Sequence, residues 1–229
     1  MADVTENAQR LMRMNGYYVA IRAGDAEKLE DLLKTETEDT FERVCRDPKN
    51  LFHVISYDDA RTLGVMLRHG KMNLDAREKD LKYTALFAAA RQNNLEIVQM
   101  LLAAGANPDI RDDRGMTPLM SAAAGGRAEV ARALVNGLAD IGLKNNAGAT
   151  AHDIARRCLD NAEIMDLDFN TREEIVDLLE DAPAQQARMR LLRAEALSMT
   201  QQRDAHARAV VQQNRLKAQR PRSLRIGGA

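Results

Sequence analysis

A sequence unit of about 33 residues recurs along this chain, and a recurrence of that length is typical of proteins built from stacked repeats. Gly-Met-Thr-Pro-Leu at 115–119 returns as Gly-Ala-Thr-Ala-His at 148–152, and Thr-Ala-Leu at 84–86 lies 33 residues before the Thr-Pro-Leu of the first of these. The same frame continues upstream through Leu51 and Tyr17. The spacing therefore predicts five units.

Two columns of this register carry small or apolar residues suited to packing between neighbouring units. The first column reads Ala20, Val54, Ala89, Ala122 and Ala155, and the second reads Leu32, Met66, Leu101, Leu134 and Leu179. Apolar residues make up 45% of the chain but aromatic residues only 3%, which favours helices over strands. Because one unit of this size cannot bury its apolar face alone, the columns must stack on their neighbours. The sequence predicts an all-α solenoid.

The residues of these units resemble the ankyrin repeat. The turn at 115–119, the Gly-Arg-Ala-Glu-Val link at 126–130 and the Gly-Ala-Asn ending at 105–107 carry the resemblance, which covers about residues 14–181. It implies that each unit is a turn and two antiparallel helices, with atypical first and fifth units as caps. The residue types fit this structure, because Thr can cap a helix, Pro suits its first turn and Gly can adopt the positive φ that ends it.

The charge of the chain divides it into an acidic body and a basic tail. Residues 182–229 contain nine Arg and one Lys against one Glu and one Asp, a net of +8, so residues 1–181 carry about −9 of the total of −1. We expect residues 1–181 to form the ankyrin-repeat domain. Residues 184–220 contain neither Gly nor Pro, which predicts one long C-terminal helix between Pro183 and Pro221.

The tail helix has several possible partners. Its first apolar stripe, from Met189 to Met199, is expected to dock against the last repeat, and a coiled coil is the alternative. Its basic residues are expected to contact the acidic body or an acidic partner. Nucleic acid bound through residues 184–220 is an alternative because Lys and Arg release counterions from phosphate, although no aromatic residue is present to stack on a base. Membrane binding is disfavoured because Ala occupies much of the apolar face.

Three departures from the repeat pattern predict irregular structure. The polar run at 34–40 is expected to be an extended, solvated link. An insertion that includes residues 160–166 is expected to protrude between the two helices of the fifth unit. His152 occupies a position where the other units carry Leu or Tyr, and we expect backbone groups of the turn to satisfy its ring.

Several classes of function are not supported by the sequence. The start of the chain has no basic segment followed by an apolar run, and no stretch has the roughly 20 apolar residues that a membrane span needs. The two cysteines, Cys45 and Cys158, are expected to be ordinary thiols of a cytoplasmic protein. The four histidines show no metal-ligand spacing, and phosphate-binding and nucleophile motifs are absent. We expect a non-enzymatic monomer without metal or cofactor.

The resemblance implies that partner proteins bind the concave face, through the turns and the first helix of each unit. The residues of this chain at those positions are Arg77, Lys79, Tyr83, Phe87, Arg91, Arg111, Asp113, Arg114, Met116, Met120, Lys144, Asn146 and Arg156. Tyr83, Phe87, Met116 and Met120 are expected to form an exposed apolar strip, and the alternative is that Phe87 and Met120 pack against adjacent units. Aromatic, Met and Arg side chains are enriched at interface centres.

These observations predict an adaptor or inhibitor that recognises proteins with acidic or mixed surfaces through its repeat face. The basic tail helix is expected to provide a second contact. The alternative function is a nucleic-acid-associated protein that binds phosphate through residues 184–220. The sequence does not indicate which protein is bound.

Overall fold

The computed structural model is helical throughout most of the part that it describes. It describes residues 14–35, 38–69, 71–80, 82–160, 170–188, 190–192 and 194. Contacts between Cα atoms group the chain into two units, Met1–Pro183 and Ala184–Ala229. The repeats lie in the first unit, which is described here by itself.

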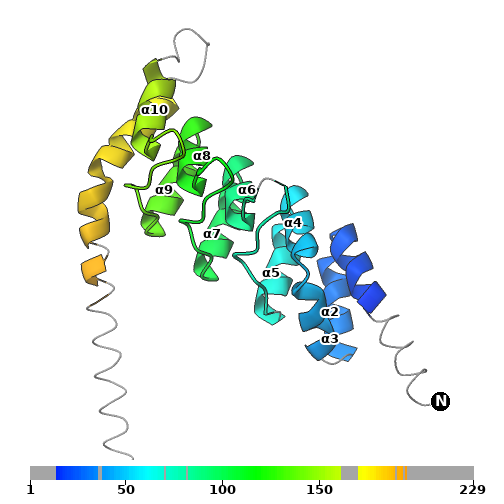
Figure 1. Cartoon of the computed structure of the whole chain (residues 1–229). Coiled ribbons are helices and arrows are strands. Elements are labelled where there is room, and N and C mark those ends of the chain that lie inside the picture. Colours follow the sequence, from blue (N-terminus) through cyan, green and yellow to red (C-terminus); the bar gives the residue numbers. More distant parts are fainter. Residues whose placement is uncertain are drawn as a thin grey trace, which may run out of the picture. The chain divides into compact units, whose positions relative to one another are not determined.

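Helices follow one another along the first unit, and those from α2 to α10 have about two to three turns each (Figure 1). A helix at 14–23 is followed by α2 (Ala26–Thr35), α3 (Glu38–Cys45), α4 (Pro48–Ser56), α5 (Ala60–His69), α6 (Ala85–Arg91), α7 (Leu95–Ala103), α8 (Pro118–Ala124), α9 (Ala128–Asn136), α10 (Ala151–Asp160) and a helix at 170–188. In the described ranges the only β pairing is an isolated antiparallel bridge between Arg77 and Thr84. The all-α prediction is confirmed.

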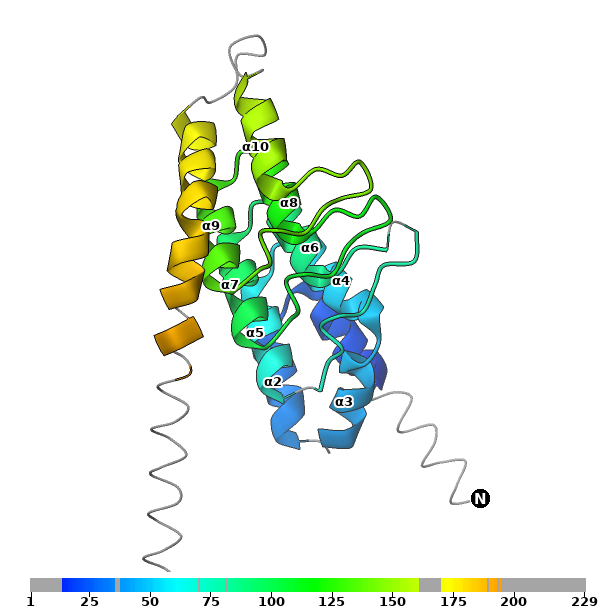
Figure 2. The same ribbon diagram turned by 60° about the vertical axis from the view of Figure 1, so that its left-hand side comes forward.

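The helices form two rows, because each helical hairpin stacks on the next (Figures 1 and 2). Helices α4, α6, α8 and α10 contact one another in order along the inner row. Helices α2, α5, α7 and α9 contact one another along the outer row. An ion pair between Arg68 and Glu30, at 2.6 Å, joins α5 to α2, and one between Arg132 and Glu174 joins α9 to the helix at 170–188.

The predicted columns form the core of the stack. Leu86, Leu119, Leu101 and Leu134 are fully buried. Members of the small-residue column are at most 1% exposed: Ala20, Val54, Ala89, Ala122 and Ala155. Leu32 differs, since it is only half-buried and Leu29 takes the fully buried place in α2. Small side chains at the crossing points allow neighbouring helices to pack closely, so the stacked-repeat prediction is confirmed.

The ends of the inner helices have the predicted capping chemistry. The hydroxyls of Thr84, Thr117 and Thr150 each accept a hydrogen bond from the backbone N–H three residues on, at 3.3, 3.2 and 3.2 Å. Pro118 lies at the start of α8, where its missing N–H leaves no bond unmade. Gly105 follows α7 with a φ of +92°, as its place in the repeat predicts.

The prediction of an extended link at 34–40 is wrong. Helix α2 continues to Thr35 and α3 begins at Glu38, with residues 36–37 outside the described ranges. Helix α3 forms because Phe41, Val44 and Cys45 share one helical face and are at most 2% exposed. The ring of Phe41 lies 5.2 Å from that of Tyr17, so α3 covers the core of the first repeat.

Two further expectations need correction at the end of the repeat array. The helical segment at 170–188 runs across Pro183, so no helix begins after this proline as the sequence predicted. His152 does not rely on turn backbone for a partner, because its Nε2 lies 3.4 Å from Glu180 Oε1 on that helix. The inserted residues 161–169 and the tail from 195 onward lie outside the described residues, as does the predicted docking of the tail stripe.

Candidate protein-binding face

Three loops project side by side from the inner row of helices (Figure 2). We call them finger 1 (71–84), finger 2 (104–117) and finger 3 (137–150), and they lead into α6, α8 and α10 respectively. Most of the residues predicted to bind a partner lie on these fingers. A few backbone hydrogen bonds close each finger, such as that from the Asp112 N–H to the Met116 carbonyl at 2.9 Å, and side chains add to them.

The tips of fingers 2 and 3 are each closed by one side chain. Asp112 Oδ1 accepts hydrogen bonds from the backbone N–H groups of Arg114, at 2.9 Å, and Met116, at 2.7 Å. In finger 3, Asn145 Oδ1 accepts bonds of 3.0 Å from the N–H groups two and four residues further on. The Asp112 side chain is only 2% exposed, so this carboxylate serves the loop rather than a partner.

A second set of hydrogen bonds connects the bases of the three fingers. Asp75 Oδ1 accepts a bond of 2.9 Å from the N–H of Asn107, and Asp109 Oδ1 accepts one of 2.7 Å from the N–H of Asp140. Within fingers 2 and 3, Asn107 Oδ1 accepts from the N–H of Asp109, and Asp140 Oδ1 from that of Gly142, at 3.0 and 2.9 Å. The result is a continuous ladder, which fixes each finger relative to the next.

The tips of fingers 2 and 3 also touch directly. The backbone N–H of Asn146 donates to the carbonyl of Arg114 at 3.1 Å, and its Nδ2 donates to the carbonyl of Asp113 at 3.0 Å. Gly115 makes this approach possible, since a Cβ there would lie 2.8 Å from the Asn146 nitrogen. The predicted partner-binding residue Asn146 therefore has a structural task as well.

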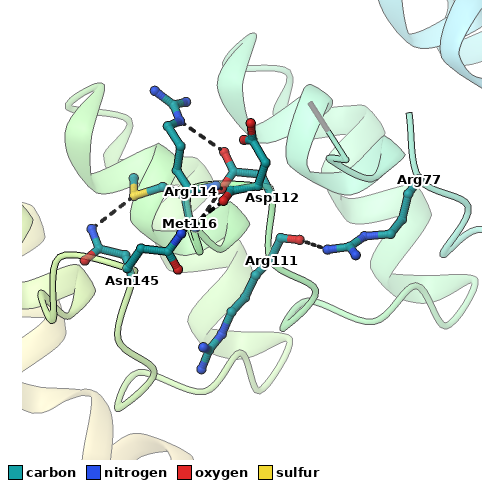
Figure 3. Close-up of polar contacts among 8 residues, drawn as sticks. Arg77, Arg111, Asp112, Arg114, Met116 and Asn145 are labelled. Carbon is teal, nitrogen blue, oxygen red and sulfur yellow. Dashed lines mark hydrogen bonds and ion pairs between the residues drawn. The ribbon is translucent and has the colours of Figure 1, made fainter. Parts of the chain in front are cut away.

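Figure 3 shows how side chains continue this network between the tips. The Arg77 guanidinium donates to the carbonyl of Arg111, which joins fingers 1 and 2. Asn145 Nδ2 lies 3.4 Å from the sulfur of Met116, which joins fingers 3 and 2. Arg114 points outward with its side chain 72% exposed, and its Nε lies 3.5 Å from the buried carboxylate of finger 2. Arginine is thus the main group that finger 2 presents to solvent.

An aromatic cluster lies where finger 1 meets the inner helices. The ring of Tyr83 stacks on Phe87 at 5.9 Å and meets the edge of Phe52 at 5.8 Å. The Arg91 guanidinium lies 5.2 Å from the centre of the same ring. A cation over an aromatic face is attracted by the π electrons, so Arg91 is held over Tyr83.

The predicted binding residues divide into three groups by exposure. The exposed ones are Arg77, Lys79, Arg91, Arg111, Asp113, Arg114, Lys144, Asn146 and Arg156. Tyr83 and Met116 are half-buried. The expectation that Phe87 and Met120 are exposed is wrong, because they are 2% and 1% exposed. Phe87 packs on Tyr83 and Met120 belongs to the shared core, so the exposed part of the face is mainly cationic.

An open hollow of about 410 Å³ lies beside finger 3. It is lined by residues 147–149 of the finger and by Asp153, Arg156, Arg157 and Asp160 of α10. Hydrogen bonds from the Thr150 backbone and hydroxyl lower the pKa of Asp153. The hollow therefore carries both signs of charge, which suits a mixed surface better than a simple anion. The described residues contain no group of three His, Cys, Asp or Glu side chains placed to hold a metal ion.

One arginine near this face was not indicated by the sequence. Arg127 lies in the link between α8 and α9, a position that the resemblance does not connect with partner binding. Its Nη1 donates to the carbonyl of Ser121 at 3.0 Å, so the side chain folds back along α8. The available signal was the glycine pair at 125–126, which leaves room for a long side chain nearby.

Comparison with known proteins supports the geometry. A family model described as ankyrin repeats in three copies matches residues 17–145, which is more than half of the chain. The chain belongs to the ankyrin-repeat family. The matched segment contains the first two fingers and part of the third, so the candidate face is built by ankyrin repeats.

Several curated ankyrin-containing or regulatory proteins are similar over part of this chain. Protein phosphatase 1 regulatory subunit 12A of Mus musculus is 38% identical over 97 residues, which is 40% of this chain but 9% of that protein. Protein phosphatase 1 regulatory subunit 27 of Mus musculus is 31% identical over 115 residues, 49% of this chain and 74% of that protein. Putative ankyrin repeat protein FPV031 of Fowlpox virus is 28% identical over 163 residues, 69% of this chain and 48% of that protein.

None of the helices in the described ranges is both long enough and apolar enough to cross a membrane.

Proposed function

We propose that this ankyrin-repeat protein is a non-enzymatic adaptor or inhibitor that binds other proteins through its fingers and the exposed side of its inner helices. The observation that carries the proposal is the ladder from Asp75 to Gly142, which joins three fingers while leaving their cationic side chains exposed. A surface that is held rigid before binding loses less conformational entropy when a partner docks.

The charges on the fingers favour a partner with an acidic or mixed surface. Lys79, Arg114 and Lys144 are exposed, one on each finger. Asp113 is exposed on finger 2, so the partner should also carry some basic or polar groups. Complementary charge speeds association and rejects partners of the wrong sign more than it adds affinity.

The relatives support a function in which this chain binds another protein. Two of those reported above are named as regulatory subunits of a phosphatase, and the match to each includes ankyrin-type sequence of this chain. Since the match covers 9% of the larger subunit, the comparison supports the class of function and not the identity of the partner.

Affinity capture from a cell lysate tests the proposal. The variant Arg114→Ala with Lys144→Ala removes two exposed cations from fingers 2 and 3, and it should reduce recovery of specific partners without changing the unfolding temperature. Lys28→Ala with Arg61→Ala is the matched control, because it removes one Lys and one Arg that are exposed on the outer helices α2 and α5. Equal recovery by both variants and the unmodified protein would contradict the proposal.

The tail is proposed as a second contact, and a chain that ends at residue 194 tests it without cutting the helical segment at 170–188. This shortened chain should retain part of its partner capture. If it instead loses salt-sensitive binding to DNA or RNA while partner capture is unchanged, the nucleic-acid alternative is favoured.

A further inference from the structure

Gly125 creates the space that Arg127 occupies. The Arg127 guanidinium lies against Gly125, and a Cβ added there would overlap it. The backbone does not require glycine at this position, since Gly125 has a φ of −89° and a ψ of 0°, and Gln92 has nearly the same angles, −87° and −1°, at the end of α6. The absence of a side chain at residue 125 therefore matters for where Arg127 can go.

A second guanidinium belongs to Arg91, the last residue of α6, and α6 packs beside α8, whose end carries Gly125 and the Arg127 side chain. Burial and then the charge of Arg91 lower the pKa of Arg127. Arg91 is exposed at the end of α6, where it lies over the Tyr83 ring. Among the described residues, neither guanidinium forms an ion pair with a carboxylate.

Two neighbouring cations without an anion are unfavourable, and an added anion would relieve their repulsion. Arg156 of α10 differs, because Asp153 and Asp160 line the same hollow as its side chain. Arg91 and Arg127 are thus two cations that no carboxylate in the described part of the chain neutralises.

We propose that Arg91 and Arg127 bind carboxylates of an acidic segment on the partner protein. This inference rests on the proposed function, and it adds to that function two binding residues and the carboxylate group that they recognise. Guanidinium groups suit carboxylates because their planar N–H donors match the two carboxylate oxygens.

The aromatic surroundings favour a protein segment over nucleic acid. Single-stranded nucleic acids bind by stacking bases on aromatic rings. The ring of Tyr83 already contacts Phe52, Phe87 and Arg91, which leaves little of it for a base. Carboxylate side chains need only the guanidinium donors.

Nuclear magnetic resonance of the full chain, titrated with octaglutamate, tests the inference. The Nε–Hε signals of Arg91 and Arg127 should shift together and give one dissociation constant. The signal of Arg61, which is exposed on α5 and forms no ion pair with another described residue, should not shift. Shifts confined to arginines of the tail would overturn the inference, and so would stronger shifts of Arg91 and Arg127 with a short DNA duplex than with octaglutamate.

Substitutions then test position as well as charge. Arg91→Gln and Arg127→Gln should each weaken octaglutamate binding, reported by the Ala124 amide, by up to about fivefold, and Arg61→Gln should not change it. Gly125→Ala keeps both arginines but displaces Arg127, so it should weaken binding about as much as Arg127→Gln. If none of the three weakens binding, this inference fails. The proposed function fails separately, if Arg114→Ala with Lys144→Ala leaves partner capture unchanged.

Discussion

Replacing Gly115 by Ala should destabilise the protein more than the same change at the equivalent glycine one repeat later. Gly115 and Gly148 lie 33 residues apart and have nearly the same φ, +74° and +77°. At Gly115 a Cβ would lie 2.8 Å from the backbone nitrogen of Asn146, whereas at Gly148 it would meet nothing within 4 Å. The two variants therefore share the cost of the backbone conformation and differ only in the contact between fingers.

The difference in free energy follows from the bonds that Asn146 makes. An L-residue in the left-handed region costs about 1–2 kcal/mol, which applies to both variants. Only Gly115→Ala also displaces Asn146, whose two hydrogen bonds to finger 2, at 3.1 and 3.0 Å, contribute about 1 kcal/mol each. We expect a loss of about 1–2 kcal/mol for Gly148→Ala and about 3–4 kcal/mol for Gly115→Ala.

Urea unfolding followed by circular dichroism at 222 nm, a standard wavelength for helix, measures both losses. The comparison uses the midpoint of each transition at a common slope, since neither change should alter the surface exposed on unfolding. Equal losses for the two variants would refute the close approach of fingers 2 and 3. A smaller loss for Gly115→Ala than for Gly148→Ala would do so more strongly.

Three further outcomes are expected. Asp112→Asn should be tolerated because Asn145 closes finger 3 in the same way, while Asp112→Ala should cost about 1–3 kcal/mol in urea unfolding by leaving two N–H groups without their acceptor. A thiol reagent should label Cys158 in the folded protein and spare Cys45, whose pKa burial raises to about 12, and mass spectrometry of the labelled chain decides this. Because the pKa of Asp153 is lowered in the folded protein, its carboxylate stabilises the fold at pH values above the ordinary pKa of an Asp, and this stabilisation is lost as the pH falls through the lowered pKa. Asp153→Asn should therefore flatten the acid side of a plot of unfolding free energy against pH.

The sequence predicts correctly those parts of the fold in which a given residue type has the same structural role in successive repeats. Thr117 caps α8 and recurs as Thr84 and Thr150, and Leu119 fills the core as Leu86 does one repeat earlier. Helix α3 has no counterpart in the other repeats, so the repeat pattern carries no information about it. Its own signal was the spacing of Phe41, Val44 and Cys45, which its acidic neighbours obscure.

The candidate face was harder to predict than the fold, because exposure depends on neighbouring side chains. Phe87 and Met120 occupy positions associated with partner contact, yet they are buried by packing on Tyr83 and within the shared core. Arg127 was missed for the opposite reason, since its path along α8 depends on the missing side chain of Gly125. Phe87 and Met120 lie one repeat apart and are both buried, whereas the path of Arg127 does not repeat from unit to unit, so reading the sequence in columns does not reveal that path.

The roles of the charged residues on finger 2 follow from the same reasoning. The sequence Arg-Asp-Asp-Arg at 111–114 has no net charge and gives no indication of which sign a partner meets. The fold uses the oxygens of Asp112 to close the loop and those of Asp109 to hold finger 3, while the guanidinium of Arg114 extends into solvent. Because a carboxylate accepts several N–H bonds at once and a guanidinium cannot accept any, backbone N–H groups draw the acidic residues inward. A finger of balanced composition therefore presents mainly cationic donors to a partner.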